Sequence, residues 1–274
     1  MKLSKISAAL AAVLAFSGCS EQETSSNKAE PKQTHQATAT SNNEFKWQVD
    51  RFADIRVIRY QVPGFEELPL ETKELLFYLY KAALSGRDIT WDHNYKYNLT
   101  IRHTLAGDKS SEEFKKFNEY TKRVWFSNGI HHHYMSGKFS PEFSPETFER
   151  YVMSVAEKGK LPLNKDQSAE QLVALLTPIL FDPTVAPKMV NQSANIDNVV
   201  ASSVNYYEGV TEQEVEDFYK NKVDVDPKRP VSWGLNSKLV KIDGKIVEQV
   251  WKVGGMYDKA ISEIVFWLDK AATV

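Results

Sequence analysis

Three helix-start signals follow one another along the middle of this chain, and each precedes apolar residues at helical spacing. The signals are Ser144-Pro145, Ser168 to Gln171 and Thr211 to Glu214. Hydroxyl groups at these positions can accept hydrogen bonds from the free N–H groups of a first helical turn, and proline fits the first helical position. The residues that we expect to be buried in these three helices are Phe148, Tyr151, Val152, Val155, Leu172, Leu175, Leu176, Ile179, Val215, Phe218 and Tyr219.

The same reasoning predicts three further helices. Leu70 to Ser85 is one, with Gly86 in the place of a glycine that ends a helix. Ser110 to Glu113 reads as a capping box that opens another. Tyr257 begins a last amphipathic stretch. The residues expected on the buried sides are Leu75, Leu76, Leu79, Ala83, Phe114, Phe117, Thr121, Val124, Trp125, Tyr257, Ile261, Ile264, Val265 and Leu268.

The clearest β signal is a hairpin near the end of the chain. Ser237–Ile242 and Lys245–Trp251 flank Asp243-Gly244, a two-residue turn of the type that favours hairpins. Asp54–Tyr60 reads as another strand. The predicted fold class is therefore α+β, mainly helical with a small antiparallel β element.

Composition places the chain among ordinary soluble proteins and excludes one class of partner. Of its 274 residues, 42% are apolar and 26% charged, and the formal net charge is −2. Because no basic stripe runs along the sequence, we expect no nucleic acid partner. The sequence also lacks the glycine-rich phosphate and dinucleotide loops and the serine elbow, so those chemistries have no local support.

The N-terminus predicts processing and attachment to a membrane. Residues 1–18 combine lysines, a short apolar stretch and small residues, as a lipoprotein signal peptide does. Cys19, the single cysteine, follows directly and is the expected lipidation site. Residues 19–43 are polar and predict a flexible tether, and residues 44–274 the folded body. The expected location is the cell envelope, lipid-anchored; the alternative is a plain secretory signal with an incidental cysteine.

Three adjacent histidines, His131, His132 and His133, raise the question of a metal site. Zinc requires three or four ligands that converge on one point, and consecutive residues do not converge. No histidine in the chain is followed by glutamate, so the zinc-binding H-E-x-x-H pattern is absent. The triplet alone is therefore a weak signal for zinc, and a polar loop after a helix is at least as good an interpretation.

Five blocks of the sequence together resemble one family, the bacterial lipoprotein branch of dipeptidyl peptidase III. The blocks are Arg59–Leu68, Lys122–Tyr134, Val204–Thr211, Gly234–Lys241 and Val250–Tyr257. The resemblance implies a two-lobed zinc exopeptidase that releases dipeptides from the N-termini of short peptides. The family binds its zinc through an H-E-x-x-G-H helix in the upper lobe, and this sequence has no such motif.

The resemblance therefore implies that this chain is the N-terminal part of such a peptidase. It would supply part of the lower, substrate-binding lobe, bind no zinc itself, and be inactive without the C-terminal lobe of the same protein. The uncapped last helix agrees with a truncated reading frame. Whether the chain is itself an enzyme stays open. The alternative is a non-catalytic envelope lipoprotein that binds peptides or protein partners.

In related enzymes the segment after the matching Ser-Asn motif approaches the cleft, which implies candidate substrate-binding residues here: Asn128, His131, His132, His133 and Tyr134. Imidazole and amide groups could pair with peptide N–H and C=O groups. The alternative is that these residues fix the corner between helix and loop. We expect Asn205–Tyr207 to be structural, all six tryptophans to be core residues, and Leu99–Leu105 to form a shortened or displaced helix.

Overall fold

The computed structural model describes residues 45–105, 112–220, 222, 228–229 and 233–274. The chain divides into two units, residues 1–45 and 46–274, and all of the elements below belong to the second. The predicted signal peptide, Cys19 and the tether lie outside the described residues, as do Ser110 and Ser111 of the expected capping box. Among the described residues, no helix is both long and apolar enough to cross a bilayer.

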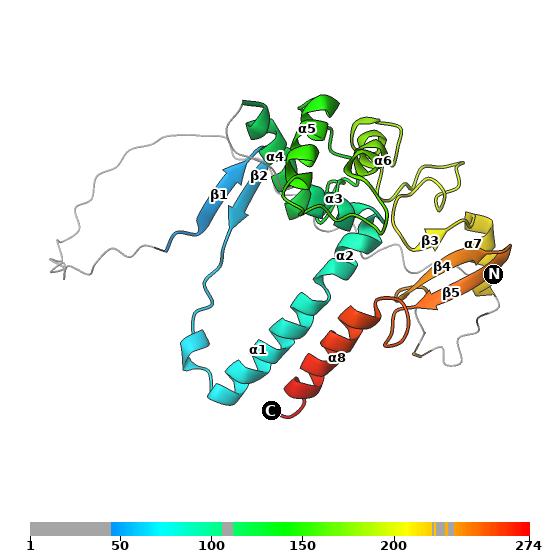
Figure 1. Ribbon diagram of the computed structural model, residues 1–274. Coiled ribbons are helices and arrows are strands. Elements are labelled where there is room, and N and C mark those ends of the chain that lie inside the picture. Colours follow the sequence, from blue (N-terminus) through cyan, green and yellow to red (C-terminus); the bar gives the residue numbers. More distant parts are fainter. Residues whose placement is uncertain (1–44, 106–111, 221, 223–227, 230–232) are drawn as a thin grey trace, which may run out of the picture. The chain divides into compact units, whose positions relative to one another are not determined.

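The described body mixes helices with two small sheets, as the sequence predicts (Figure 1). The elements in chain order are β1 (Gln48–Phe52), β2 (Ile55–Ile58), the 3-10 turn η1 (Phe65–Glu67), α1 (Leu70–Ser85), α2 (Arg87–Asn94), α3 (Asn98–Thr104), α4 (Glu112–Phe126), α5 (Pro145–Ala156), α6 (Ala169–Phe181), β3 (Tyr207–Glu208), α7 (Glu212–Lys220), β4 (Ser237–Ile242), β5 (Lys245–Val250) and α8 (Asp258–Ala271).

The three middle helices begin where their caps predict. The Ser144 hydroxyl accepts from the Thr147 N–H at the start of α5. Ser168 and Gln171 form a reciprocal capping box at the start of α6. At α7 the Thr211 N–H donates to the Glu214 carboxylate, 3.0 Å away. Local side chain to backbone hydrogen bonds fix these helix starts, which is why sequence alone could place them.

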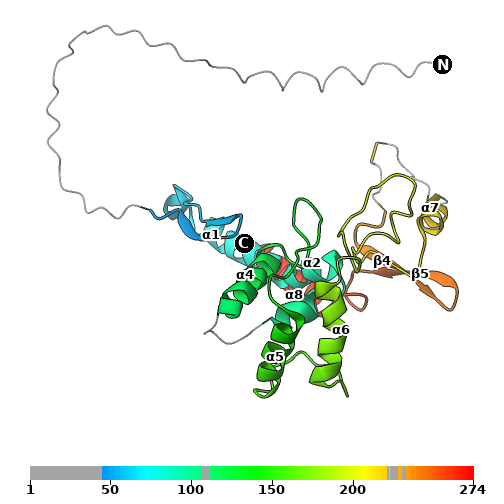
Figure 2. The same cartoon turned by 90° about the horizontal axis from the view of Figure 1, so that it is seen from above.

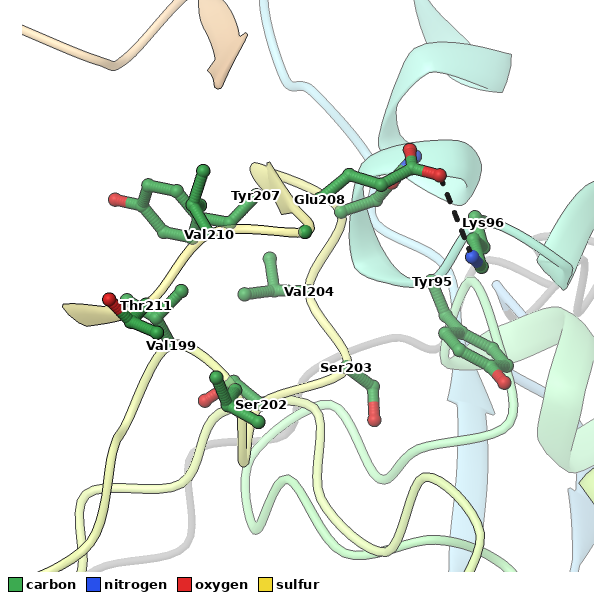
Figure 3. Close-up of a pocket in the computed structure, with 13 residues that line it drawn as sticks. Tyr95, Lys96, Val199, Ser202, Ser203, Val204, Tyr207, Glu208, Val210 and Thr211 are labelled. Carbon is green, nitrogen blue, oxygen red and sulfur yellow. Dashed lines mark ion pairs between the residues drawn. The ribbon is translucent and has the colours of Figure 1, made fainter. Parts of the chain in front are cut away.

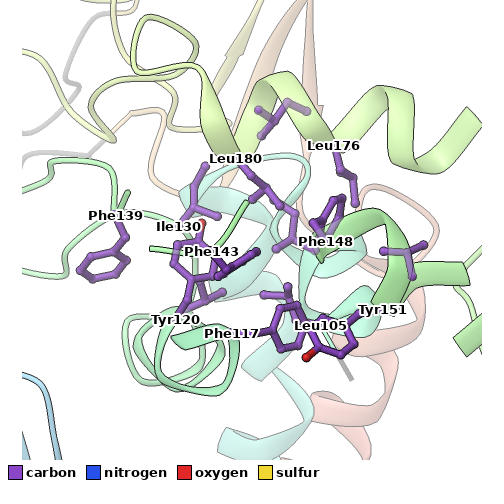
Figure 4. Close-up of a cluster of buried hydrophobic side chains, with 14 of the residues drawn as sticks. Leu105, Phe117, Tyr120, Ile130, Phe139, Phe143, Phe148, Tyr151, Leu176 and Leu180 are labelled. Atoms are coloured by element: carbon purple, nitrogen blue, oxygen red, sulfur yellow. The ribbon is translucent and has the colours of Figure 1, made fainter. Parts of the chain in front are cut away.

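Helices α2 to α6 and the segment between α4 and α5 enclose the main hydrophobic core (Figure 4). Phe148, Leu172 and Leu176 are fully buried there, and Figure 2 shows α5 and α6 side by side. On α4 the buried residues are Phe117, Tyr120, Thr121 and Val124. Trp125 was expected to be buried with them, but it is 47% exposed because it lies just off that stripe.

Helices α1 and α8 pack against each other, with Trp267 of α8 stacked on Tyr78 of α1 (Figure 1). The predicted buried face of α1 is wrong. Only Ala82 is fully buried in this helix, whereas Leu76, Leu79 and Ala83 are exposed. On α8, Val265 and Leu268 are likewise exposed. Apolar residues surround most of α1, and α8 covers only one side of it.

Gly86 follows Ser85, the last residue of α1, as expected from the sequence. Its φ of −84° is right-handed, and the chain continues directly into α2, which the sequence reading missed. A Cβ at this position would lie 3.3 Å from Cδ1 of Ile264 on α8. The glycine therefore permits the close approach of α8 at the junction of α1 and α2.

Two sheets complete the body. The hairpin β4–β5 is confirmed, and Asp243 and Gly244 both have positive φ as a tight hairpin turn requires. Strand β3 joins β4 in parallel, so this sheet is mixed rather than purely antiparallel. The predicted strand at residues 54–60 is β2, whose antiparallel partner β1 was not foreseen.

The expectation that all six tryptophans are core residues is wrong. Trp91 is buried, and Trp251 and Trp267 are partly buried. Trp47 and Trp233, like Trp125, are more than two-fifths exposed. The short helix expected at residues 99–105 is α3, with Ile101 and Leu105 buried in the core.

Candidate functional site

The candidate site is the segment from Ser127 to Met135, which follows α4. The segment turns sharply, because Asn128 has a left-handed φ of 53° and Gly129 a φ of 147°. Its far end is held by paired backbone groups, since the His132 N–H donates to Gly137 O at 2.8 Å. The Met189 N–H donates to Ser136 O, also at 2.8 Å.

The fully buried side chain of Asn98 organises this corner. Its Oδ1 accepts from the Ile130 N–H at 3.2 Å, and its Nδ2 donates to the Trp91 carbonyl at 3.1 Å. Gly129 packs so closely that an added Cβ would lie 2.2 Å from Asn98 Nδ2. One buried amide therefore joins α2, the start of α3 and the candidate loop. The sequence reading missed Asn98, since nothing in its local pattern marks it.

His131 points into the protein. Its ring is 2% exposed and lies edge-on to Tyr95, with ring centroids 5.8 Å apart. Its Nε2 is 2.8 Å from the Ala186 carbonyl, a distance that requires the proton on this nitrogen. Burial lowers the pKa of His131 to about 4, although the bond to Ala186 opposes that shift. These contacts agree with the alternative that this histidine fixes the corner.

His132, His133 and Tyr134 form a surface group of three neighbouring rings. His132 and His133 stack with centroids 4.7 Å apart and planes 8° apart. The ring of Tyr134 lies 4.3 Å from that of His133. Tyr134 is 86% exposed, and His133 is also exposed. This ring surface could stack against an aromatic or peptide group of a bound chain.

Both imidazoles in this surface also have a local role. His132 Nδ1 accepts from the N–H groups of Tyr134 and Met135, at 3.1 and 3.2 Å. His133 Nδ1 lies 3.2 Å from the Ser127 hydroxyl. Because Nδ1 is engaged in each ring, Nε2 is the nitrogen left to meet a ligand. Of the five predicted residues, His133 and Tyr134 are exposed beside the half-buried His132, Asn128 is partly buried at the turn, and His131 is buried.

The partly buried cation Lys138 anchors the chain just after the loop. The Lys138 ammonium donates to three backbone carbonyls at and beyond the end of α6, those of Ile179, Asp182 and Val185. Burial lowers the pKa of Lys138. The contact satisfies carbonyls that the helix end leaves without partners. Lys138 therefore connects the chain after His133 to Val185, next to Ala186, whose carbonyl accepts from His131.

Among the residues that the structure describes, no group of three or more His, Cys, Asp or Glu side chains could hold a metal ion. The ring surface can offer stacking and hydrogen bonds to a bound molecule.

Comparison with known proteins adds no assignment. No protein-family model matches this chain, and no curated protein matches it. The role of Asn128 and of the histidine segment in substrate binding stays a prediction.

Proposed function

We propose that residues 44–274 form part of the substrate-binding lobe of a dipeptidyl peptidase III-like zinc peptidase. In this proposal, short peptides lie with their N-terminal part near the ring surface of His132, His133 and Tyr134. The zinc and the H-E-x-x-G-H helix belong to a lobe outside this sequence, so the chain alone releases no dipeptides.

The observation that carries the proposal is the exposed apolar face of α1 and α8. Helical spacing marks Leu76, Leu79 and Ala83 as a face to be buried, yet all three are exposed. Large apolar side chains extend this face on both helices. They are Phe77, Tyr80, Leu84, Val265, Phe266 and Leu268. Contiguous apolar surface of this kind is typical of a region that contacts more protein.

Two further features support the proposal. The five sequence blocks that resemble the family are spread over the body, and one of them contains the candidate loop. That loop is held rigidly by Asn98 and Lys138, so its outward rings are presented in one arrangement. Fixed side chains lower the cost of ordering a recognition surface when a peptide binds.

The coding DNA that follows the Val274 codon tests the proposal. An in-frame continuation that encodes H-E-x-x-G-H is the expected result. A stop codon there would instead favour the alternative, an envelope lipoprotein that holds peptides or protein partners without catalysis. The apolar face of α1 and α8 would then be the surface on which such a partner binds.

A further inference from the structure

A separate pocket lies beside the segment that leads into β3 and α7. Its volume is about 390 Å³, within the range of small-molecule sites. Tyr95 and Lys96, at the corner between α2 and α3, form one side (Figure 3). The opposite side comes from residues 199–211, and much of it is apolar. The valines that line it are Val199, Val200, Val204 and Val210.

Lys96 and Glu208 are the charged residues that line this pocket, and Lys238 pairs with Glu208 from outside it, so these three groups together carry one positive charge. The side chain of Lys238, which is 8% exposed, pairs closely with one carboxylate oxygen of Glu208. That bond holds the pKa of Glu208 below its usual value, so the pair is neutral as a unit. Lys96 forms a long ion pair with the other oxygen, at 3.9 Å, which is too far for a hydrogen bond, and its side chain is half exposed (Figure 3). Its ammonium therefore retains donors for a ligand.

Two backbone donors beside the pocket are already in use. At the start of α7, the Glu212 N–H donates to Asp197 Oδ2 and the Thr211 N–H donates to Glu214. These acidic side chains occupy the helix end that would otherwise favour a phosphate. A doubly charged anion would meet one free ammonium and several carboxylates. A cationic ligand would meet a Glu208 that Lys238 already neutralises. A single negative charge fits this arrangement best.

We infer that this pocket binds a small monocarboxylate with a branched aliphatic body, such as the C-terminal valine or leucine of a short peptide. The carboxylate lies on the Lys96 ammonium, and the aliphatic part contacts Val204 and Val210. The inference goes beyond the proposed function, because no pocket residue belongs to the loop of residues 127–135. It holds whether or not the chain is part of a peptidase.

Methyl NMR of the valine-labelled full chain tests the inference, because the pocket wall itself carries the labels. N-acetyl-L-leucine is the probe, and we expect saturable shifts of a small set of valine methyls with a dissociation constant on the order of 1 mM. N-acetyl-L-leucinamide has the same body without the charge, and we expect it to bind about 5-fold more weakly.

Variants locate the site. Lys96→Gln keeps the length of the side chain but removes its charge, and we expect about 5-fold weaker binding of N-acetyl-L-leucine. Lys259→Gln, at an exposed position on α8, is the matched control and should bind as the wild type does. Val200→Ser, at an exposed position of the pocket rim, should also weaken binding. Equal affinity for the acid and the amide, or wild-type affinity in Lys96→Gln, would overturn the inference.

Discussion

The Tyr257 hydroxyl donates a hydrogen bond to Asp92 Oδ2 at 2.5 Å, which links the start of α8 to α2. The same carboxylate oxygen accepts from Asn205 Nδ2 at 3.0 Å, just before β3. Burial and the neighbouring Asp92 raise the pKa of Tyr257, so its phenol stays protonated and can donate. One carboxylate thus connects three segments that are distant in sequence.

Removal of this hydroxyl should destabilise the body. We expect Tyr257→Phe to lower the free energy of unfolding by about 1–3 kcal/mol, because the Asp92 carboxylate loses the hydrogen bond that the Tyr257 hydroxyl donates to it. Tyr134→Phe makes the same chemical change on a ring that is 86% exposed and should leave stability unchanged. Denaturant unfolding followed by tryptophan fluorescence measures both. Equal stability of the two variants would show that the Asp92 contact contributes little.

The buried His131 predicts a loss of stability in mild acid. Its pKa is near 6.5 in an unfolded chain and about 4 in the fold, so the unfolded state takes up the proton first. Its contribution is complete above pH 6.5 and is lost as the pH falls from there toward 4. Between about pH 7.5 and pH 5 the loss should be about 2 kcal/mol.

A non-titrating variant isolates that contribution. His131→Gln retains an amide that can donate to the Ala186 carbonyl, and its free energy of unfolding should depend less on pH over the same range. His103→Gln, at an exposed position of α3, should retain the wild-type dependence. If His131→Gln and wild type had parallel stability curves against pH, the assignment to His131 would be incorrect.

The close packing of Gly129 on Asn98 predicts that this glycine cannot be replaced. Gly129→Ala should destabilise by about 3 kcal/mol or more, because the new Cβ meets the buried amide at a backbone φ of 147°. Gly64 also has a positive φ, but an added Cβ there meets no atom within 4 Å. Gly64→Ala should therefore cost only about 1 kcal/mol, and thermal unfolding of the pair would reveal the difference.

The exposed face of α1 and α8 should bind an apolar dye in the native state. Anilinonaphthalene sulfonate fluorescence should be high for the wild type and should fall by about half in Tyr80→Glu with Val265→Glu. These two positions are exposed, so the substitutions leave the core intact. Lys259→Glu changes a charge on α8 without removing apolar surface and should not alter the signal. Unchanged fluorescence in the double variant would place the dye elsewhere.

Local signals in the sequence predicted much of this fold, and tertiary contacts account for what they missed. The caps at Ser144 and Ser168 and the turn at Asp243-Gly244 act within a few residues, so their elements were placed correctly. Gly86 was placed correctly at the end of α1, but no local pattern reveals that Ile264 of α8 packs against it. The spacing of apolar residues on α1 predicted a buried face, but it did not show which part of the protein would cover that face.

The candidate loop shows the same division. The sequence marked the histidines as a group, but only the fold separates buried His131 from the stacked pair that follows. Asn98 holds the loop from α3, Lys138 bonds from just after the loop to the segment that follows α6, and neither residue carries a motif. Their importance comes from burial and from partners that only the folded chain brings together.

Hydrolysis of a dipeptidyl-naphthylamide in the presence of zinc tests the central proposal most directly. We predict that the chain of residues 1–274 releases no naphthylamine above background. The same chain extended in frame by a lobe with H-E-x-x-G-H should release it, and a chelator should abolish that activity. Chelator-sensitive release by residues 1–274 alone, or none by the extended protein, would contradict the proposal.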